Sequence, residues 1–200
     1  MKKTLSTLPV VLLVAVLGFG TIVASTTSQA AAPFQQKQVA GFYRTTVGAF
    51  EVTALLDGTT TFDVHWLKAQ PAEIQPLAAR QYQEHGKLAG TVAAFLINTG
   101  KQLILVDTGS GGFWGGPTLG HLTKNLRASG YRPEQVDLIV LTHLHADHVA
   151  GLRNPNGTRK FPNATVSMLQ TDSEFWLSKE IASKAPPEAK EFFDIAQASA

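Results

Sequence analysis

The 200-residue sequence contains no cysteine. The chain therefore cannot form disulfides, and its fold depends on the packing of a hydrophobic core. The same absence argues against a closed structural zinc site, because such sites usually contain cysteine thiolates. A strong excess of one charge is also missing, since the formal net charge is +2 at pH 7. Nothing in this balance indicates nucleic acid or an anionic membrane surface as a partner.

Long apolar runs are missing too, except at the N-terminus. Met1-Lys2-Lys3 is a basic start, Leu8 to Gly20 is almost wholly apolar, and the small polar residues that follow end in an A-x-A-like context at Ala30. This layout is typical of a secretory signal peptide over residues 1–30. A membrane anchor is the alternative, but the apolar run is shorter than the ~20 residues that a spanning helix needs. We therefore expect a periplasmic or secreted domain over residues 31–200, with no membrane association after cleavage.

Histidine is concentrated in one short segment, H-L-H-A-D-H at residues 143–148, which holds three of the six histidines of the chain. Imidazole and carboxylate are the groups that bind Zn²⁺ and similar divalent ions. The segment follows Val136 to Leu141, an apolar and β-branched run that predicts a buried strand. A strand that ends in a loop rich in ligands is a rigid support for a metal site. A histidine-rich surface turn is the alternative interpretation.

The spacing within this segment suggests how the side chains are shared between ions. His143 and His145 are two residues apart, so in extended backbone they project to the same side and can bind one ion together. Asp147 and His148 are adjacent where the chain leaves the strand, and we expect them to point in different directions. They are then available to a second ion a few ångströms away, as in two-metal hydrolytic sites.

The pattern H-x-H-x-D-H after a hydrophobic strand resembles the signature of the metallo-β-lactamase superfamily. Phe95–Asn98 and Leu103–Gly109 resemble the early hairpin and the VDTG turn of that family. Further segments resemble secreted organophosphate hydrolases of the methyl parathion hydrolase group. These segments are Gly41–Arg44, Phe50–Gly58, Pro117–Gly120, Gly130–Asp137 and Phe175–Ser178. The resemblance covers nearly all of the chain from Gly41 onward, and it implies an α/β fold of the layered αββα sandwich type.

The same resemblance implies a hydrolase with two zinc ions, although other divalent metals would also suit the ligands. His143 and His145 would bind the first ion, and Asp147 and His148 the second, with Asp147 also orienting the attacking water. Organophosphate triesters are the favoured small-molecule substrates, and lactones or β-lactams on the same site are the alternative. A non-catalytic exported binding protein or an inactive fragment is a third interpretation. A homodimer remains open.

Two histidines and a bridging carboxylate that complete the family's site cannot be assigned in this sequence. No histidine follows His148, and no aspartate can be identified as the bridging ligand. The sequence therefore resembles the N-terminal portion of a longer enzyme. We expect the 200 residues alone to bind metal weakly and to show little turnover.

Aromatic residues are the candidates for substrate contacts. Phe113 and Trp114 lie in a glycine-rich loop and Trp176 follows the motif, so together they could line the mouth of a site for an apolar ester. A position in the helix core is an equally good interpretation for Trp176, Phe192 and Phe193. Asp107, at the end of a predicted strand, is expected beside the metal ligands or simply in a turn. Ordinary surface or core roles are expected for the remaining histidines, which are His65, His85 and His121.

Periodicity and turn signals predict the main elements around the motif. A strand region over 46–56 is expected to end in a turn at Asp57-Gly58, with a return strand over 59–64. A hairpin is expected over 91–106 and a helix between 119 and 130. After the motif we expect a strand over 164–169, a helix through 177 and a last helix over 188–200.

Overall fold

The structure is a computed structural model, and it describes residues 32–34, 36–83 and 86–200. Gln38 to Ala200 form one compact unit, which is described here by itself. The expected signal peptide over 1–30 lies outside the described residues. No helix in the described ranges combines the length and the apolar character needed to cross a bilayer.

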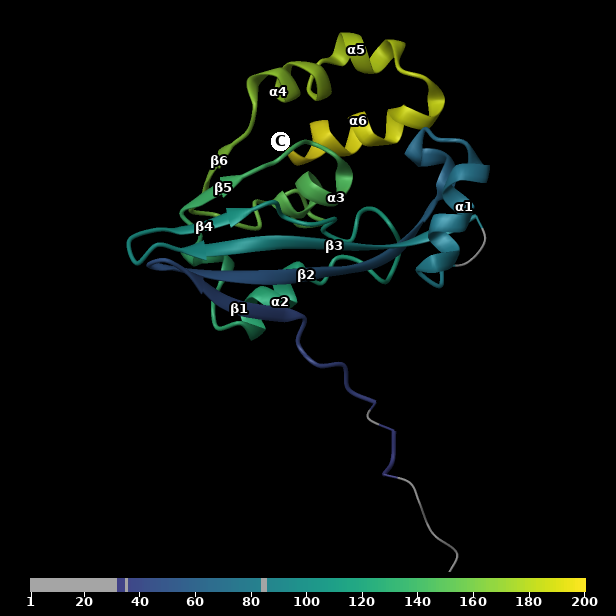
Figure 1. Cartoon of the computed structure of the whole chain (residues 1–200). Helices are drawn as coiled ribbons and strands as arrows, with labels where there is room; N and C mark the ends of the chain where they lie inside the picture. Colours follow the sequence, from purple (N-terminus) through teal and green to yellow (C-terminus); the bar gives the residue numbers. More distant parts are fainter. Residues whose placement is uncertain (1–31, 35, 84–85) are drawn as a thin grey trace, which may run out of the picture. The chain divides into compact units, whose positions relative to one another are not determined.

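A six-stranded sheet with the strand order β1-β2-β3-β4-β5-β6 organises this unit (Figure 1). The first four strands pair antiparallel, whereas β4, β5 and β6 pair parallel. The strands are β1 (Phe42–Val47), β2 (Phe50–Asp63), β3 (Lys87–Asn98), β4 (Leu103–Val106), β5 (Leu138–Val140) and β6 (Thr165–Ser167). The parallel half positions the site, because parallel strands bring their C-terminal ends to the same edge of the sheet.

Helices cover both faces of the sheet (Figure 1). Helix α2 (Leu122–Ala128) packs against β1 and β2, and α3 (Ala146–Val149) and α6 (Pro187–Ser199) contact each other on the opposite face. The other helical segments are η1 (Val64–Leu67), α1 (Pro71–Arg80), η2 (Pro133–Gln135), η3 (Ala150–Leu152), α4 (Gln170–Trp176) and α5 (Lys179–Lys184). The expected α/β class is confirmed. The described residues contain one sheet of the αββα arrangement, with helices on its two faces.

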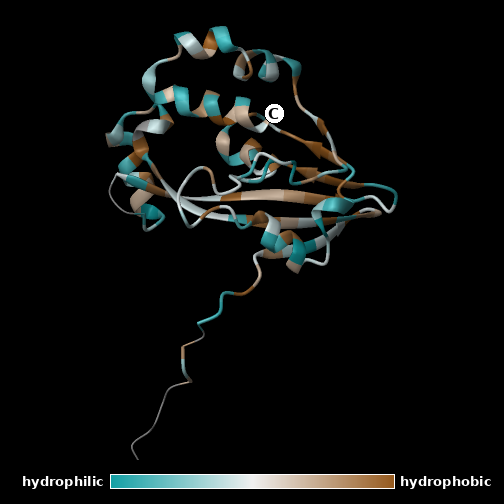
Figure 2. Ribbon diagram, turned by 180° about the vertical axis from the view of Figure 1, so that it is seen from behind, coloured by the Kyte–Doolittle hydropathy of each residue, from teal (hydrophilic) through white to brown (hydrophobic). Residues whose placement is uncertain are grey.

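The core lies between the sheet and these helices. Leu105 of β4 and Ile139 of β5 are completely buried, as are Leu126 of α2 and Val149 of α3. Figure 2 shows hydrophobic residues along the short parallel strands and many hydrophilic residues on the peripheral helices. Burial of each large aliphatic side chain stabilises the fold by roughly 1.5–3 kcal/mol. The ligand-bearing segment after β5 is thus anchored on a packed support.

The Asp57-Gly58 pair is not a turn, so this prediction was wrong. Strand β2 continues through the pair to Asp63, with a bulge between Leu56 and Gly58, and pairs with β3 on both sides of it. The hairpin turn lies at Gly48-Ala49. A Cβ atom at Gly58 would lie 1.9 Å from the carbonyl oxygen of Thr118. Glycine is needed there because a loop approaches the strand closely, not because the chain reverses.

Candidate metal centre

The C-terminal ends of β4 and β5 bring Asp107 and the histidine motif together. Asp107 directly follows β4, and its backbone N–H donates to the carbonyl oxygen of Val140 in β5 at 3.0 Å. Its φ of 63° is left-handed, which turns the carboxylate toward the segment after β5. There the Asp107 carboxylate accepts hydrogen bonds from the backbone N–H of Thr142 at 2.8 Å and from its hydroxyl at 2.9 Å. This places Asp107 beside the candidate ligands, which is one of the two positions expected from the sequence.

His143 and His145 lie on the same side of the chain, as their spacing predicts. Their imidazole rings are 4.6 Å apart between centroids. The alternating residues Leu144 and Ala146 are completely buried. The hydrophobic effect on these two residues fixes the direction of the chain, so the two imidazoles face away from the core.

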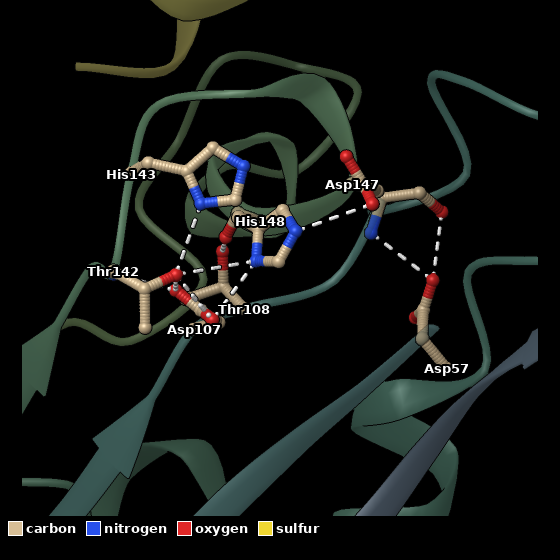
Figure 3. Close-up of polar contacts among 8 residues, drawn as sticks. Asp57, Asp107, Thr108, Thr142, His143, Asp147 and His148 are labelled. Atoms are coloured by element: carbon tan, nitrogen blue, oxygen red, sulfur yellow. Dashed lines mark hydrogen bonds and ion pairs between the residues drawn. The ribbon is translucent and has the colours of Figure 1, made fainter. Parts of the chain in front are cut away.

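Asp147 and His148 do not diverge, in contrast to the expectation. Asp147 Oδ2 lies 3.2 Å from His148 Nε2, and the His148 ring lies 4.0 Å from the His143 ring between centroids (Figure 3). Both residues belong to the short helix α3, in which neighbouring side chains are separated by about 100° instead of the 180° of a strand. The helical backbone therefore brings all four candidate ligands into one cluster.

His148 is held from both sides by carboxylates. Its Nδ1 lies 2.9 Å from Asp107 Oδ2, opposite the contact of Nε2 with Asp147 (Figure 3). Its backbone carbonyl accepts hydrogen bonds from the Thr108 N–H at 2.8 Å and the Thr108 hydroxyl at 2.7 Å. These contacts fix both the ring and the main chain of His148 to the end of β4.

The cluster changes the protonation of its members. Burial alone would lower the pKa of His148, but hydrogen bonds with Asp107 and Asp147 outweigh burial and raise it to about 9. Burial also opposes ionisation of Asp147, yet the hydrogen bond and charge of His148 lower the pKa of that carboxyl. Burial lowers the pKa values of His143 and His145. These two imidazoles are therefore neutral at pH 7, which is the form that binds metal ions.

The donor chemistry of this cluster fits a divalent ion such as Zn²⁺, which takes imidazole nitrogen and carboxylate oxygen. The described residues nevertheless contain no group of three or more histidine, aspartate or glutamate side chains already placed as ligands around one ion. His148 has both ring nitrogens in contact with carboxylates. An ion bound at Nε2 would take the place of the proton between His148 and Asp147, so these two side chains would have to move apart.

An aromatic pocket of about 290 Å³ adjoins the cluster. Several elements and loops contribute to its wall, and the lining residues are Phe62, Trp66, Trp114, His145, Asp147, Trp176 and Phe192. The rings are in mutual contact: Trp114 stacks on Phe62 at 6.3 Å, and Trp176 meets His145 edge-on at 5.1 Å. A larger apolar groove of about 630 Å³ beside α1 contains none of the motif side chains.

The structure brings two of the three predicted substrate contacts to this pocket. Trp114 and Trp176 line it, whereas Phe113 lines a separate pocket with Arg153 and Pro155. Of these two neighbouring loop residues, Trp114 lines the pocket that adjoins the cluster and Phe113 does not. Of the remaining aromatic candidates, Phe192 joins the pocket and Phe193 is buried in the core. The exposed side chain of His121 lies at the start of α2, outside the motif, in line with the ordinary role expected for it.

Asp57 is a structural residue of this region that the sequence did not reveal. Its carboxylate is completely buried and accepts four hydrogen bonds, from Ser110 and Gly120 of the loop that carries Trp114 and from Leu122 at the start of α2. The donors are the backbone N–H and hydroxyl of Ser110 and the backbone N–H groups of Gly120 and Leu122, at 2.8–3.0 Å. Asp57 therefore fixes both ends of the glycine-rich loop to strand β2.

A sheet edge with histidine and carboxylate ligands beside an aromatic pocket defines an α/β protein of the metallohydrolase type. Residues 89–184 match the model of the metallo-beta-lactamase superfamily. The crystal structure of AbOPH, a hydrolase in the beta lactamase superfamily, is similar with a TM-score of 0.74 and 40% identity. The match covers 82% of this chain and 57% of AbOPH.

A second structure, of the dizinc quorum-quenching lactonase AidC, shares the fold with a TM-score of 0.66 and 23% identity. That match covers 80% of this chain and 60% of AidC. This chain thus spans less than two thirds of the length of either protein. The match to the family model and the similarity to AbOPH support the metallo-β-lactamase superfamily for this chain, and AidC supports the fold.

Proposed function

We propose that this chain carries half of the active site of an exported, zinc-dependent hydrolase that acts on organophosphate triesters. The observation that supports this most is the cluster of four candidate ligands, two of which, His145 and Asp147, line an aromatic pocket. His143 and His145 would hold one ion, and Asp147 and His148 a second. Bound divalent ions make a hydroxide nucleophile available near neutral pH and polarise the oxygen that is under attack.

The residues of the chain contribute binding and orientation to this chemistry. Asp107 holds Nδ1 of His148, so the opposite nitrogen is directed toward the cluster. Asp147 lines the pocket and stays ionised because its pKa is lowered, so its carboxylate would accept a hydrogen bond from a water in the pocket and orient that water. Trp114 and Trp176 provide flat apolar surfaces that would bind an aryl or alkyl ester group and keep bulk water out.

The choice of substrate is tested by comparing an aryl phosphotriester, an acyl-homoserine lactone and a β-lactam. The protein is expressed from its whole reading frame and assayed with Zn²⁺, with and without a chelator. We expect the highest kcat/KM on the phosphotriester and loss of this activity with the chelator. A higher kcat/KM on the lactone or the β-lactam would reject the proposed substrate class. Absence of all three activities in metal-loaded protein would favour a non-catalytic role.

The aromatic pocket leads to a separate prediction about substrate affinity. Trp114→Ala is expected to raise KM for an aryl phosphotriester about tenfold, since loss of one aromatic contact of ~1.4 kcal/mol corresponds to that factor. The adjacent Phe113→Ala is the matched control, because its ring lines a different pocket, and we expect less than a twofold change. Equal effects of the two substitutions in steady-state kinetics would contradict this assignment of the pocket.

A further inference from the structure

Asp172 carries an unusual buried atom. Its Oδ2 is shielded from solvent and accepts no hydrogen bond, and within the described ranges no other buried side-chain nitrogen or oxygen lacks a partner. A carboxylate oxygen that has lost water without gaining a donor is unfavourable by roughly 1–3 kcal/mol or more. A buried oxygen of this kind needs a physical reason. One such reason is that the oxygen accepts a hydrogen bond in another state of the protein.

The face of α4 that carries Asp172 is directed toward the metal cluster. Asp172 and Trp176 are four residues apart in this helix, so their side chains lie on the same face. The Trp176 ring contacts His145 edge-on, with 5.1 Å between centroids and an angle of 83° between planes. The Asp172 carboxylate also interacts electrostatically with the same ring.

His145 lacks the partner that the other two imidazoles have. Nδ1 of His143 lies 3.1 Å from the Thr142 hydroxyl, and Nδ1 of His148 lies 2.9 Å from Asp107. In the described part of the chain, no hydrogen bond is made by either ring nitrogen of His145. A neutral imidazole has one N–H and one lone pair, and the group that accepts from the N–H determines which nitrogen can bind a metal ion.

We propose that Asp172 is the positioning residue of His145 in the zinc-bound protein: in that state its Oδ2 accepts the ring N–H of His145 and leaves the opposite nitrogen to bind the metal ion. The inference rests on the proposed function, because a fixed tautomer of His145 matters only if this ring is a ligand. It makes Asp172 the counterpart of Asp107, which has the same role for His148. Loss of the carboxylate from a carboxylate–histidine–metal arrangement of this kind typically lowers metal affinity 10- to 100-fold.

A purely structural role of Asp172 is the competing explanation, since it lies in the first turn of α4. There its negative charge would interact favourably with the helix dipole. Such a role predicts a change in thermal stability and no specific change in metal binding. The test therefore needs a measurement at His145 itself in addition to stability.

The experiment compares Zn²⁺ affinity by calorimetry with the ¹⁵N–¹H spectrum of the histidine rings in the zinc-bound protein. Asp172→Asn is expected to weaken Zn²⁺ binding about 10- to 100-fold, and to shift or broaden the hydrogen-bonded ring N–H signal of His145. Asp172→Glu should recover part of the affinity. Glu174→Gln is the control, because Glu174 is an exposed acid of the same helix whose carboxylate accepts a hydrogen bond from Gln170 on the same helix. The Zn²⁺ affinity of Glu174→Gln should stay within twofold of that of the wild type.

The outcomes separate the two proposals. If the wild-type protein does not bind Zn²⁺, the proposed function fails and the role of Asp172 fails with it. If the wild type binds Zn²⁺ and Asp172→Asn binds it equally well with an unchanged His145 signal, only the role of Asp172 is rejected. A lower Tm for Asp172→Asn with unchanged Zn²⁺ affinity would assign the residue to helix stability instead.

Discussion

Substitution of His145 by alanine is expected to weaken Zn²⁺ binding by about 100-fold and to reduce metal-dependent hydrolysis to the level seen with a chelator. Zinc sites with four protein ligands bind with roughly 10–16 kcal/mol, so one ligand contributes about 3 kcal/mol, or a factor of about 100. His145 is well placed for this role, because its ring is exposed on the pocket wall beside His143. Its removal creates no cavity in the core, so the free energy of unfolding of the metal-free protein should change little.

The matched control for this substitution is His121→Ala. His121 is an exposed histidine at the start of α2 and lies outside the ligand cluster. Calorimetric titration with Zn²⁺ and steady-state kinetics should leave this variant close to the wild type. Wild-type Zn²⁺ affinity in His145→Ala would show that the ion is bound elsewhere and would contradict the ligand assignment.

The arrangement of the motif at the centre of the site was predictable because it depends on residues that are neighbours in the sequence. The strand before the motif is marked by a continuous apolar run, and the two-residue spacing of His143 and His145 fixes their common side once the backbone is extended. Asp107 could be placed only in part, since the end of a predicted strand suits a position beside the ligands and a simple turn equally well. In each case a few neighbouring residues determine the geometry.

The direction of Asp147 and His148 required information that local spacing does not contain. The expectation of diverging side chains was made for the point where the chain leaves the strand and did not include a helix there, but helix α3 begins at Ala146. Ala146 and Val149 are completely buried, so packing against the core stabilises a helix of four residues that would not form in isolation. Tertiary contacts, not helix propensity, bring Asp147 onto His148.

The wall of the pocket was only partly predictable, because it depends on pairing between distant segments. Phe62 and Trp66 precede the motif by about eighty residues, and they reach it only because β2 continues beyond Asp57. The sequence indicated a turn at Asp57-Gly58, which would have ended the strand before Phe62. Because the strand was expected to end at this turn, Phe62 and Trp66 were not among the residues predicted for the site.

Asp57→Ala is expected to be among the most destabilising substitutions in this protein, with a loss of about 3–5 kcal/mol in the free energy of unfolding. The substitution removes both acceptors of four hydrogen bonds and leaves buried donors of Ser110, Gly120 and Leu122 without partners. Each buried donor without a partner costs about 1–3 kcal/mol, although relaxation of the loop and entry of water will recover part of the sum. Asp57→Asn should cost less, because one side-chain oxygen still accepts.

The matched control is Asp137→Ala, in which an exposed carboxylate loses one acceptor contact with the backbone N–H of Leu103 at 2.8 Å. We expect a loss of about 1 kcal/mol for this single bond. Urea unfolding of both variants gives the comparison, and tryptophan fluorescence reports whether Trp114 leaves its contact with Phe62.

Because Asp57 fixes both ends of the Trp114 loop, Asp57→Asn should also raise KM for an aryl ester. Equal stability of Asp57→Ala and Asp137→Ala would show that the loop is held by other contacts, such as that between Gly151 N–H and the Gly109 carbonyl at 3.0 Å.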